Sequence, residues 1–314
     1  MTPIFSSGAA GNIFLSVLGI LVMVLAGYLA AKKSLITQGG IGELSKIVFN
    51  ISIPSLILAK MLTSYKPEMF FASLYLPLFA VINILFVNYL LALASARMLS
   101  ITGKDRNVYL YLNTFQNYTY MPLPLVAMLF GPDKMIYVIL FGVAGDILNY
   151  TVGIKLFNEK RPFFSWKLLS TPALAATLLG FAFVFLKIQV PAGLIKPVAF
   201  LGDITVPLAM IVTGGVAAGI KLKDAFKIIT EKKMVALVLL KLIITPLVIL
   251  LLTIPFHMNP VIRAIIVLQA SMPSAFAAII FSKQYGKNAD LAAAGALVTT
   301  VLSALTVPVI FSLL

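Results

Sequence analysis

Two short polar clusters interrupt apolar stretches of the chain and hold the side chains best suited to binding a small molecule. The first contains Asn113, Gln116, Asn117, Tyr120, Pro122 and Pro124, and the second contains Gln269, Ser271, Pro273 and Ser274. Amide and hydroxyl groups donate hydrogen bonds to a carboxylate, and the free N–H groups at the start of a helix also favour an anion. The residues we take as binding candidates, with donors that would suit a carboxylate, are Asn113, Gln116, Asn117, Tyr120, Gln269, Ser271, Pro273 and Ser274.

Pro122, Pro124 and Pro273 predict that both stretches are interrupted helices. Proline has no backbone N–H and disrupts the carbonyl acceptor four residues earlier. Within a bilayer such freed groups need partners, so broken helices occur only where protein or a water-filled cavity covers them. A second interpretation also fits these residues, because buried amides often do no more than hold packed helices together.

Two aspartates within apolar stretches are candidates for an ion-coupling role. Asp146 lies near the middle of one stretch, and Asp203 lies in the outer part of another. Ionisable groups inside a membrane are costly, so each aspartate could bind a proton or Na⁺, or could instead form a structural ion pair. Lys60 and Lys241 also fall within apolar stretches. We expect their long side chains to extend to the membrane surface.

The remaining residues argue against an enzyme and against a metal or cofactor site. The chain has no cysteine and a single histidine, which excludes thiolate ligands, cysteine nucleophiles and histidine cages. It contains neither a glycine-rich phosphate loop nor an HExxH motif. We therefore expect no catalytic residue, no metal and no cofactor.

The elements that position these residues are predicted to be membrane-spanning helices. Of the 314 residues 61% are hydrophobic and 11% are charged, and the mean hydropathy is +1.06. Soluble domains are about 45–50% apolar and about 25% charged. The composition excludes intrinsic disorder, a disulfide-rich secreted domain and nucleic-acid binding, and it makes the lipid bilayer the first expected partner.

Ten apolar runs have about the 20-residue length that a bilayer-crossing helix needs. The expected spans are 12–31, 43–64, 70–96, 107–130, 134–155, 168–187, 194–219, 234–255, 261–282 and 290–312. Short polar turns separate them, and no connection is long enough for a soluble domain. The predicted fold class is an all-α polytopic membrane protein.

Basic residues are concentrated in the odd-numbered connections between these spans. Those connections hold 17 of the 24 Lys and Arg residues, the even-numbered ones hold 5, and Lys60 and Lys241 lie inside spans. Because cytoplasmic loops carry an excess of Lys and Arg, the odd-numbered loops are predicted to be cytoplasmic and both termini outside. The net charge of +14 thus reflects topology rather than an acidic partner.

The two halves of the chain contain matching segments. Residues 50–54 (NISIP) match 203–207 (DITVP), and Met121-Pro122 matches Met272-Pro273. Each half holds five predicted spans, an odd number, so two copies must face opposite ways across the membrane. Inverted repeats with interrupted helices at matching positions are typical of secondary transporters, whose substrate sites lie near the bilayer midplane.

Four segments form a pattern in fixed order: 117–125 (NYTYMPLPL), 206–210 (VPLAM) followed by Gly214-Gly215, 272–275 (MPSA), and 290–292 (DLA) followed by 299–303 (TTVLS). In order and spacing they resemble the auxin efflux carrier family, which includes plant hormone exporters and bacterial permeases. Gln116 stands where plant carriers have a proline, and Pro122 stands where the family usually has glycine. The resemblance pairs Gln116 with Pro273, whereas the Met-Pro match pairs Pro122 with Pro273, so two registers stay open.

The resemblance implies ten transmembrane helices in two inverted five-helix repeats, 1–160 and 161–314, with broken fourth and ninth helices that cross at the substrate site. It also implies a scaffold bundle and a transport bundle that move against each other. Family members carry organic anions, auxin in plants and dicarboxylates such as malonate or malate in bacteria. The short fifth connection lacks the large hydrophilic loop of many plant carriers, which favours a prokaryotic cytoplasmic (inner) membrane.

The favoured function is a secondary carrier, a permease or efflux carrier, that moves a small organic anion by alternating access. Its partners would be the bilayer, the anion and, if transport is coupled, H⁺ or Na⁺. A homodimer is compatible with the sequence. The alternative is a sodium- or proton-coupled symporter of the bile-acid-symporter type, and a channel or membrane-embedded sensor is a third hypothesis.

Overall fold

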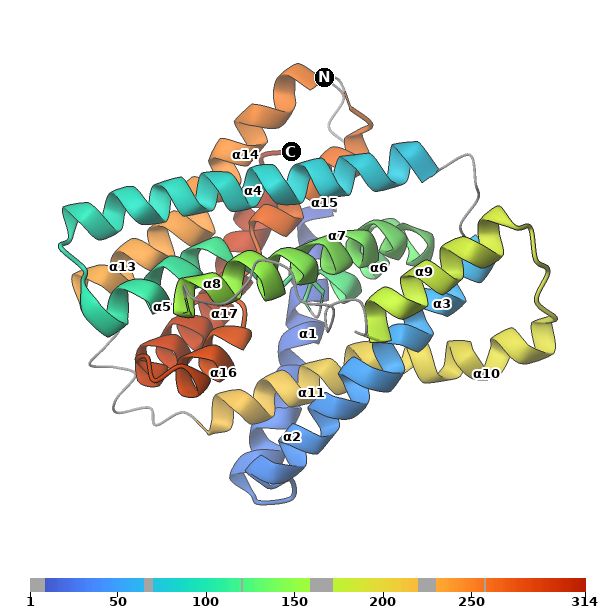
Figure 1. Ribbon diagram of the computed structural model, residues 1–314, viewed down its shortest axis with the longest axis horizontal. Helices are drawn as coiled ribbons and strands as arrows, with labels where there is room; N and C mark the ends of the chain where they lie inside the picture. The colour runs from blue at the N-terminus through green and yellow to red at the C-terminus, as the bar shows by residue number, and fades with distance from the viewer. Residues whose placement is uncertain (1–8, 65–69, 120, 159–171, 220–229, 257) are drawn as a thin grey trace.

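The structure is a computed structural model, and it describes residues 9–64, 70–119, 121–158, 172–219, 230–256 and 258–314. Apart from one β-bridge, all regular structure in these ranges is helical (Figure 1). Within these described ranges, six helical segments are long and apolar enough to cross a membrane, and three shorter apolar helices accompany them. The chain is an all-helical, multi-pass membrane protein, as its composition predicts.

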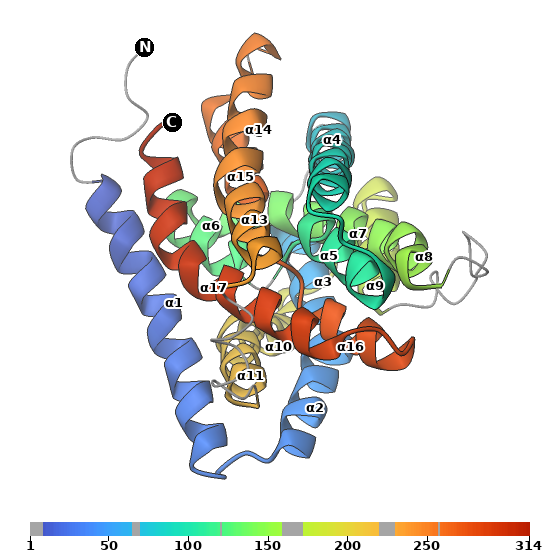
Figure 2. The ribbon, with the colours of Figure 1, turned by 90° about the vertical axis from the view of Figure 1, so that its left-hand side faces the viewer.

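One set of helices, here called the flanking bundle, pairs segments from both halves of the chain. In this bundle α1 packs along α11, and α3 packs against α9 and α10 (Figures 1 and 2). Its elements are α1 (Ala9–Lys32), α2 (Gln38–Ile47), the π-helical turn η1 (Val48–Ser52), α3 (Ile53–Ser64), α9 (Pro172–Phe185), α10 (Ala192–Asp203) and α11 (Thr205–Ala218).

The other helices form what we call the crossing bundle. In this bundle α4 packs against α5 and α7, and α17 packs against α5 and α16. From the first half it takes α4 (Phe70–Met98), α5 (Gly103–Thr114), α6 (Pro122–Phe130), η3 (Pro132–Lys134), α7 (Met135–Leu148), η4 (Asn149–Gly153) and α8 (Ile154–Phe157). From the second it takes α13 (Lys232–Leu239), η6 (Leu240–Ile244), α14 (Thr245–Thr253), η7 (Ile254–Phe256), α15 (Pro260–Ala270), α16 (Ala277–Gln284) and α17 (Ala289–Phe311).

Glycines allow α1 and α11 to approach closely in the flanking bundle. A Cβ atom on Gly27 would overlap the main chain of Ile211, and one on Gly214 would overlap the main chain of Val24. Small residues at helix contacts of this kind are the usual means by which membrane helices pack, since apolar side chains gain little from leaving lipid. The two halves of the chain are therefore joined in this bundle by direct backbone contact.

The predicted interruptions are found in the structure. The expected spans 107–130 and 261–282 are each split into two helices, α5 with α6 and α15 with α16, joined by non-helical residues. Three other described spans continue through π-helical turns rather than breaking, namely α2–η1–α3, α7–η4–α8 and α13–η6–α14. Both interrupted segments lie in the crossing bundle.

Candidate functional site

The two interrupted segments cross as antiparallel extended chains. Gln116 lies opposite Ser274 in a β-bridge. The Asn117 N–H donates to the Pro273 carbonyl at 2.8 Å, and the Ala275 N–H donates to the Phe115 carbonyl at 3.1 Å. Gln116 and Ser274 are 158 residues apart, so the bridge lies one residue from the register that pairs Gln116 with Pro273.

Each proline frees a carbonyl that a glutamine from the opposite segment binds. Pro122 cannot donate to the carbonyl of Tyr118, four residues earlier, and Pro273 cannot donate to that of Gln269. The Gln269 Nε2 donates to the Tyr118 carbonyl at 3.1 Å. The Gln116 Nε2 donates to the Gln269 carbonyl at 2.6 Å. The matching Met-Pro dipeptides thus mark two equivalent acceptors, and two glutamines lock the crossing.

The carboxyl end of α5 is covered by donors from three other elements. The last carbonyls of a helix lack intrahelical partners and must find others in a membrane. Ser274 Oγ donates to the Leu112 carbonyl at 2.7 Å, Lys241 Nζ to the Asn113 carbonyl at 2.7 Å, and Asn88 Nδ2 to the Thr114 carbonyl at 3.3 Å. The half-helix is therefore held rigidly against α4, η6 and the second crossing segment.

The other predicted binding residues lie at or beside the crossing and are buried. The Asn113 Nδ2 donates to the Tyr109 carbonyl within α5, and Ser271 Oγ donates to the Val267 carbonyl within α15. Asn117 is 8% exposed, more than Gln116, Gln269 or Ser274, each at most 1% exposed. Tyr120 lies outside the described residues.

The predicted helix breaks at Pro122 and Pro124 lie inside the first turn of α6 rather than at the break itself. Proline is favourable there because the first N–H groups of a helix have no partner to lose. Pro273 lies within the non-helical segment between α15 and α16, as predicted. The described residues of the two segments that lie outside helices and turns are 115–119 and 272–275.

The two aspartates have different positions. Asp146 follows Gly145 in α7, on which the Tyr118 ring packs, and its carboxylate interacts electrostatically with Tyr118 of the first crossing segment. No hydrogen bond or ion pair joins Asp146 to another described residue. Asp203 is the last residue of α10 in the flanking bundle and is exposed. Of the two, only Asp146 is close to the crossing.

Sequence reasoning missed the role of Lys241 and of Asn88. Lys241 was expected to extend to the membrane surface, but its side chain is fully buried in η6 and donates to the crossing. Asn88 is one of two asparagines in the apolar helix α4, and Thr245 Oγ1 donates to its Oδ1 at 2.6 Å. A polar residue in the middle of an apolar run indicates a buried polar partner. Only the packing shows which groups Lys241 and Asn88 reach.

A cavity of about 500 Å³ adjoins the crossing between α4, α5 and the α7–η4–α8 helix. Thr114 and Phe115 link it to the crossing, and its mainly apolar lining includes the cations of Arg106 and Lys155. An apolar body with a few cationic groups suits an organic anion.

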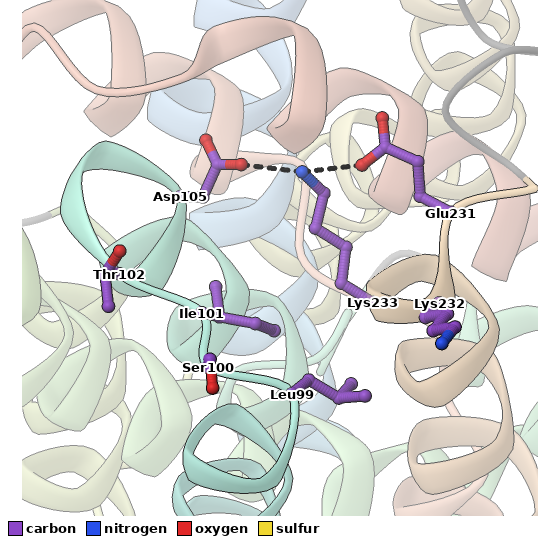
Figure 3. A pocket seen from close by; sticks show the side chains of 8 residues that line it. All are labelled: Leu99, Ser100, Ile101, Thr102, Asp105, Glu231, Lys232 and Lys233. Atoms are coloured by element: carbon purple, nitrogen blue, oxygen red, sulfur yellow. Dashed lines mark hydrogen bonds and ion pairs between the residues drawn. The ribbon is translucent and has the colours of Figure 1, made fainter.

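A second cavity, of about 390 Å³, lies at the start of α5 and α13 (Figure 3). There Lys233 Nζ lies between Asp105 Oδ2 at 2.6 Å and Glu231 Oε2 at 2.7 Å. Partial burial alone would raise the pKa of Asp105, but hydrogen bonds from Lys233 and Asn288, with the Lys233 charge, lower this pKa below its ordinary value. Lys233, Asp105 and Glu231 neutralise one another's charges. We therefore assign this cavity a structural role.

A family model described as membrane transport protein matches residues 12–164 and again 161–311, which together cover nearly the whole chain. The chain belongs to this family, the auxin efflux carrier family. This auxin efflux carrier family member is thus a membrane transporter and not an enzyme. The two matches fall on the two halves, consistent with a repeated architecture.

Two archaeal relatives of this family member align over most of its length. An uncharacterized transporter of Methanocaldococcus jannaschii is 23% identical over 299 residues, covering 93% of this chain and 95% of the relative. An uncharacterized transporter of Methanothermobacter thermautotrophicus is 24% identical over 305 residues, with the same shares covered. Both similarities extend across the flanking and crossing bundles.

Proposed function

We propose that this family member is a secondary carrier that moves a small organic anion by alternating access. The observation that carries the proposal is the antiparallel crossing of two interrupted segments, one from each half, inside a bundle of apolar helices. Secondary transporters bind their substrates at such discontinuous helices near the bilayer midplane, where half-helix ends offer unpaired groups. An enzyme or a purely structural protein has no need of this geometry.

The proposed architecture is ten membrane crossings in two inverted repeats, residues 1–160 and 161–314. The six long apolar helices, the helices α1 and α9, and the two split segments α5–α6 and α15–α16 together make up the ten proposed crossings. In this proposal the flanking bundle is the scaffold and the crossing bundle moves against it. The distribution of Lys and Arg supports cytoplasmic odd-numbered loops and outer termini, in a prokaryotic cytoplasmic membrane.

An anionic substrate is supported by the groups that converge on the crossing. The amino ends of α6 and α16 both begin beside it, and helix amino ends attract negative charge. Asn117 lies between α5 and α6 along the chain and is the least buried of the crossing amides. We assign it to substrate binding, together with Asn113, Ser271, Ser274 and Pro273, while the side chains of Gln116 and Gln269 mainly hold the crossing together.

Replacement of Asn117 tests the site. A hydrogen bond to a charged group contributes about 1.5–3 kcal/mol, so Asn117→Ala should weaken substrate affinity about 10–100-fold. A thermal-shift panel of mono- and dicarboxylates on the purified protein identifies a ligand by mass action. Uptake of that compound into proteoliposomes then gives the affinity.

The matched control is Asn83→Ala, since Asn83 is half-buried on α4 and its amide bonds the Phe79 carbonyl of the same helix. This control should transport like the wild type. Undiminished uptake by a folded Asn117→Ala protein would overturn the assignment of this residue. Voltage-clamped proteoliposomes test the channel hypothesis. Currents far larger than an alternating-access carrier can produce would favour a channel.

A second candidate function is ion-coupled symport, in the manner of bile-acid symporters. The position of Asp146 beside the crossing, without a partner among the described residues, supports it. A carboxylate next to a substrate site can take up and release a proton as the site changes sides. Coupling would add an energy source to the same carrier.

A further inference from the structure

Lys241 is a fully buried lysine at the carboxyl end of a half-helix. Its side chain is 0% exposed, and its Nζ donates to the Asn113 carbonyl at 2.7 Å and to Gln116 Oε1 at 3.3 Å. Asn88 Nδ2 reaches the same Gln116 oxygen at 3.3 Å. All of these oxygens are uncharged. Lys241 takes part in none of the ion pairs formed by the described residues.

The surroundings of Lys241 resemble the ligand shell of a metal cation more than an ion pair. Two more side-chain oxygens of the interrupted segments, Asn113 Oδ1 and Gln269 Oε1, are buried without a donor among the described residues. The amide nitrogens of both residues are bound to carbonyls, which fixes which atom is oxygen. A helix carboxyl end adds roughly half a negative charge. Neutral oxygens and a helix end are the groups that hold Na⁺ in proteins of this kind.

The equivalent end of the second half-helix has no such cation among its described contacts. The carbonyls of Val267, Leu268 and Gln269 accept only from neutral donors, namely the backbone and hydroxyl of Ser271, the Met272 N–H and the Gln116 amide. The crossing is therefore asymmetric, with positive charge at the α5 end alone. The need for a donor at a helix end does not explain the lysine, because the neutral amide of Gln116 fills the same need at the end of α15.

We infer that Lys241 is a tethered cation that occupies the place of a coupling Na⁺ at the α5 end. Its ammonium group neutralises the half-helix end and places a positive charge at the crossing. Because the cation is covalently attached, the crossing needs no Na⁺ from solution. If transport is coupled to an ion, that ion would then be H⁺ rather than Na⁺. This consequence rests on the proposed carrier function.

The experiment compares melting temperatures of the purified full chain in NaCl and in N-methyl-D-glucamine chloride at equal ionic strength. Wild type should melt at the same temperature in both salts. Lys241→Ala removes the ammonium and opens space among the oxygens, so Na⁺ should raise its melting temperature in a saturable way. Lys241→Met removes the charge but fills the space, so it should melt lower than wild type in both salts.

Lys60→Ala is the matched control, because Lys60 is a half-buried lysine in α3 of the flanking bundle; it should respond to neither salt. A Na⁺-specific rise in the wild-type melting temperature would overturn the inference. So would a folded Lys241→Ala protein that ignores Na⁺. If Lys241→Ala folds in neither salt, the inference is tested by the melting temperatures of the wild type and Lys241→Met in the two salts. No substrate is present, so a failed search for an organic anion bears on the proposed function alone.

Discussion

At the residue scale, the crossing depends on reciprocal bonds between side chains of one segment and backbone of the other. Pro122 and Pro273 each leave a carbonyl without its helical donor, and Gln269 and Gln116 supply the replacements. An unsatisfied buried carbonyl costs about 1–3 kcal/mol. The glutamines are therefore positioning residues, and their conservative replacement should affect stability before it affects substrate affinity.

Gln269→Leu should lower the free energy of unfolding by about 1–3 kcal/mol, because it leaves the Tyr118 carbonyl buried without a donor. Adding Pro122→Ala restores an N–H four residues after Tyr118, so the double variant should recover part of this loss. The melting temperatures of Gln269→Leu and of the double variant measure the loss and the recovery of stability. Gln189→Leu, at an exposed position, is the control and should be near neutral. A double variant less stable than Gln269→Leu would argue against this pairing.

At the element scale, α7 lies unusually close to the crossing segment because glycines face it. A Cβ on Gly145 would lie 2.5 Å from the Tyr118 ring, and one on Gly142 would overlap the Thr119 hydroxyl. The helix can therefore present Asp146 directly beside the crossing. Asp203, on α10, is carried by the flanking bundle and does not move with the site in the proposed mechanism.

Asp146→Asn should abolish the response of transport to a proton gradient, because an amide cannot carry a proton across. Uptake into proteoliposomes with and without an inward-directed proton gradient gives the stimulation. This ratio should fall to about one in the variant if one proton carrier serves the site. Asp203→Asn should keep the wild-type ratio. A gradient response that survives in Asp146→Asn would exclude this carboxylate as the coupling group.

At the scale of the whole molecule, the path of the chain agrees with an even number of crossings. The start of α1 and the end of α17 lie on the same side, while the start of α2 lies on the opposite side (Figure 2). The Lys and Arg residues concentrate in the odd-numbered connections, which begin with the one between α1 and α2. The proposed orientation therefore puts that connection in the cytoplasm.

Single cysteines test this orientation cleanly, because the chain has none of its own. Thr102 precedes α5 in an odd-numbered connection, and Gln189 lies between α9 and α10 in an even-numbered one; both are exposed. A membrane-impermeant maleimide should label Gln189→Cys in intact cells, and Thr102→Cys only after permeabilisation. The cysteine-free parent controls for background. Labelling of Thr102→Cys in intact cells would reverse the topology.

Much of the architecture followed from sequence because its causes are local. Apolar run length determined where helices lie, and the prolines at 122 and 273 determined which spans are interrupted. Family motifs then identified the carrier class, which the matches to both halves confirm. These features depend on neighbours in the chain, so a linear reading recovers them.

Only the tertiary structure decided how the interrupted segments meet. The register of Gln116 with Ser274, the exchange of glutamine bonds, and the burial of Lys241 against Asn113 all join residues more than 120 positions apart. From sequence, Lys241 looked like a lysine extending to the membrane surface. Whether the Lys241 side chain is buried or extends to the membrane surface depends on which polar oxygens the packing brings within its reach. In an apolar interior a charged group is stable only where such partners surround it.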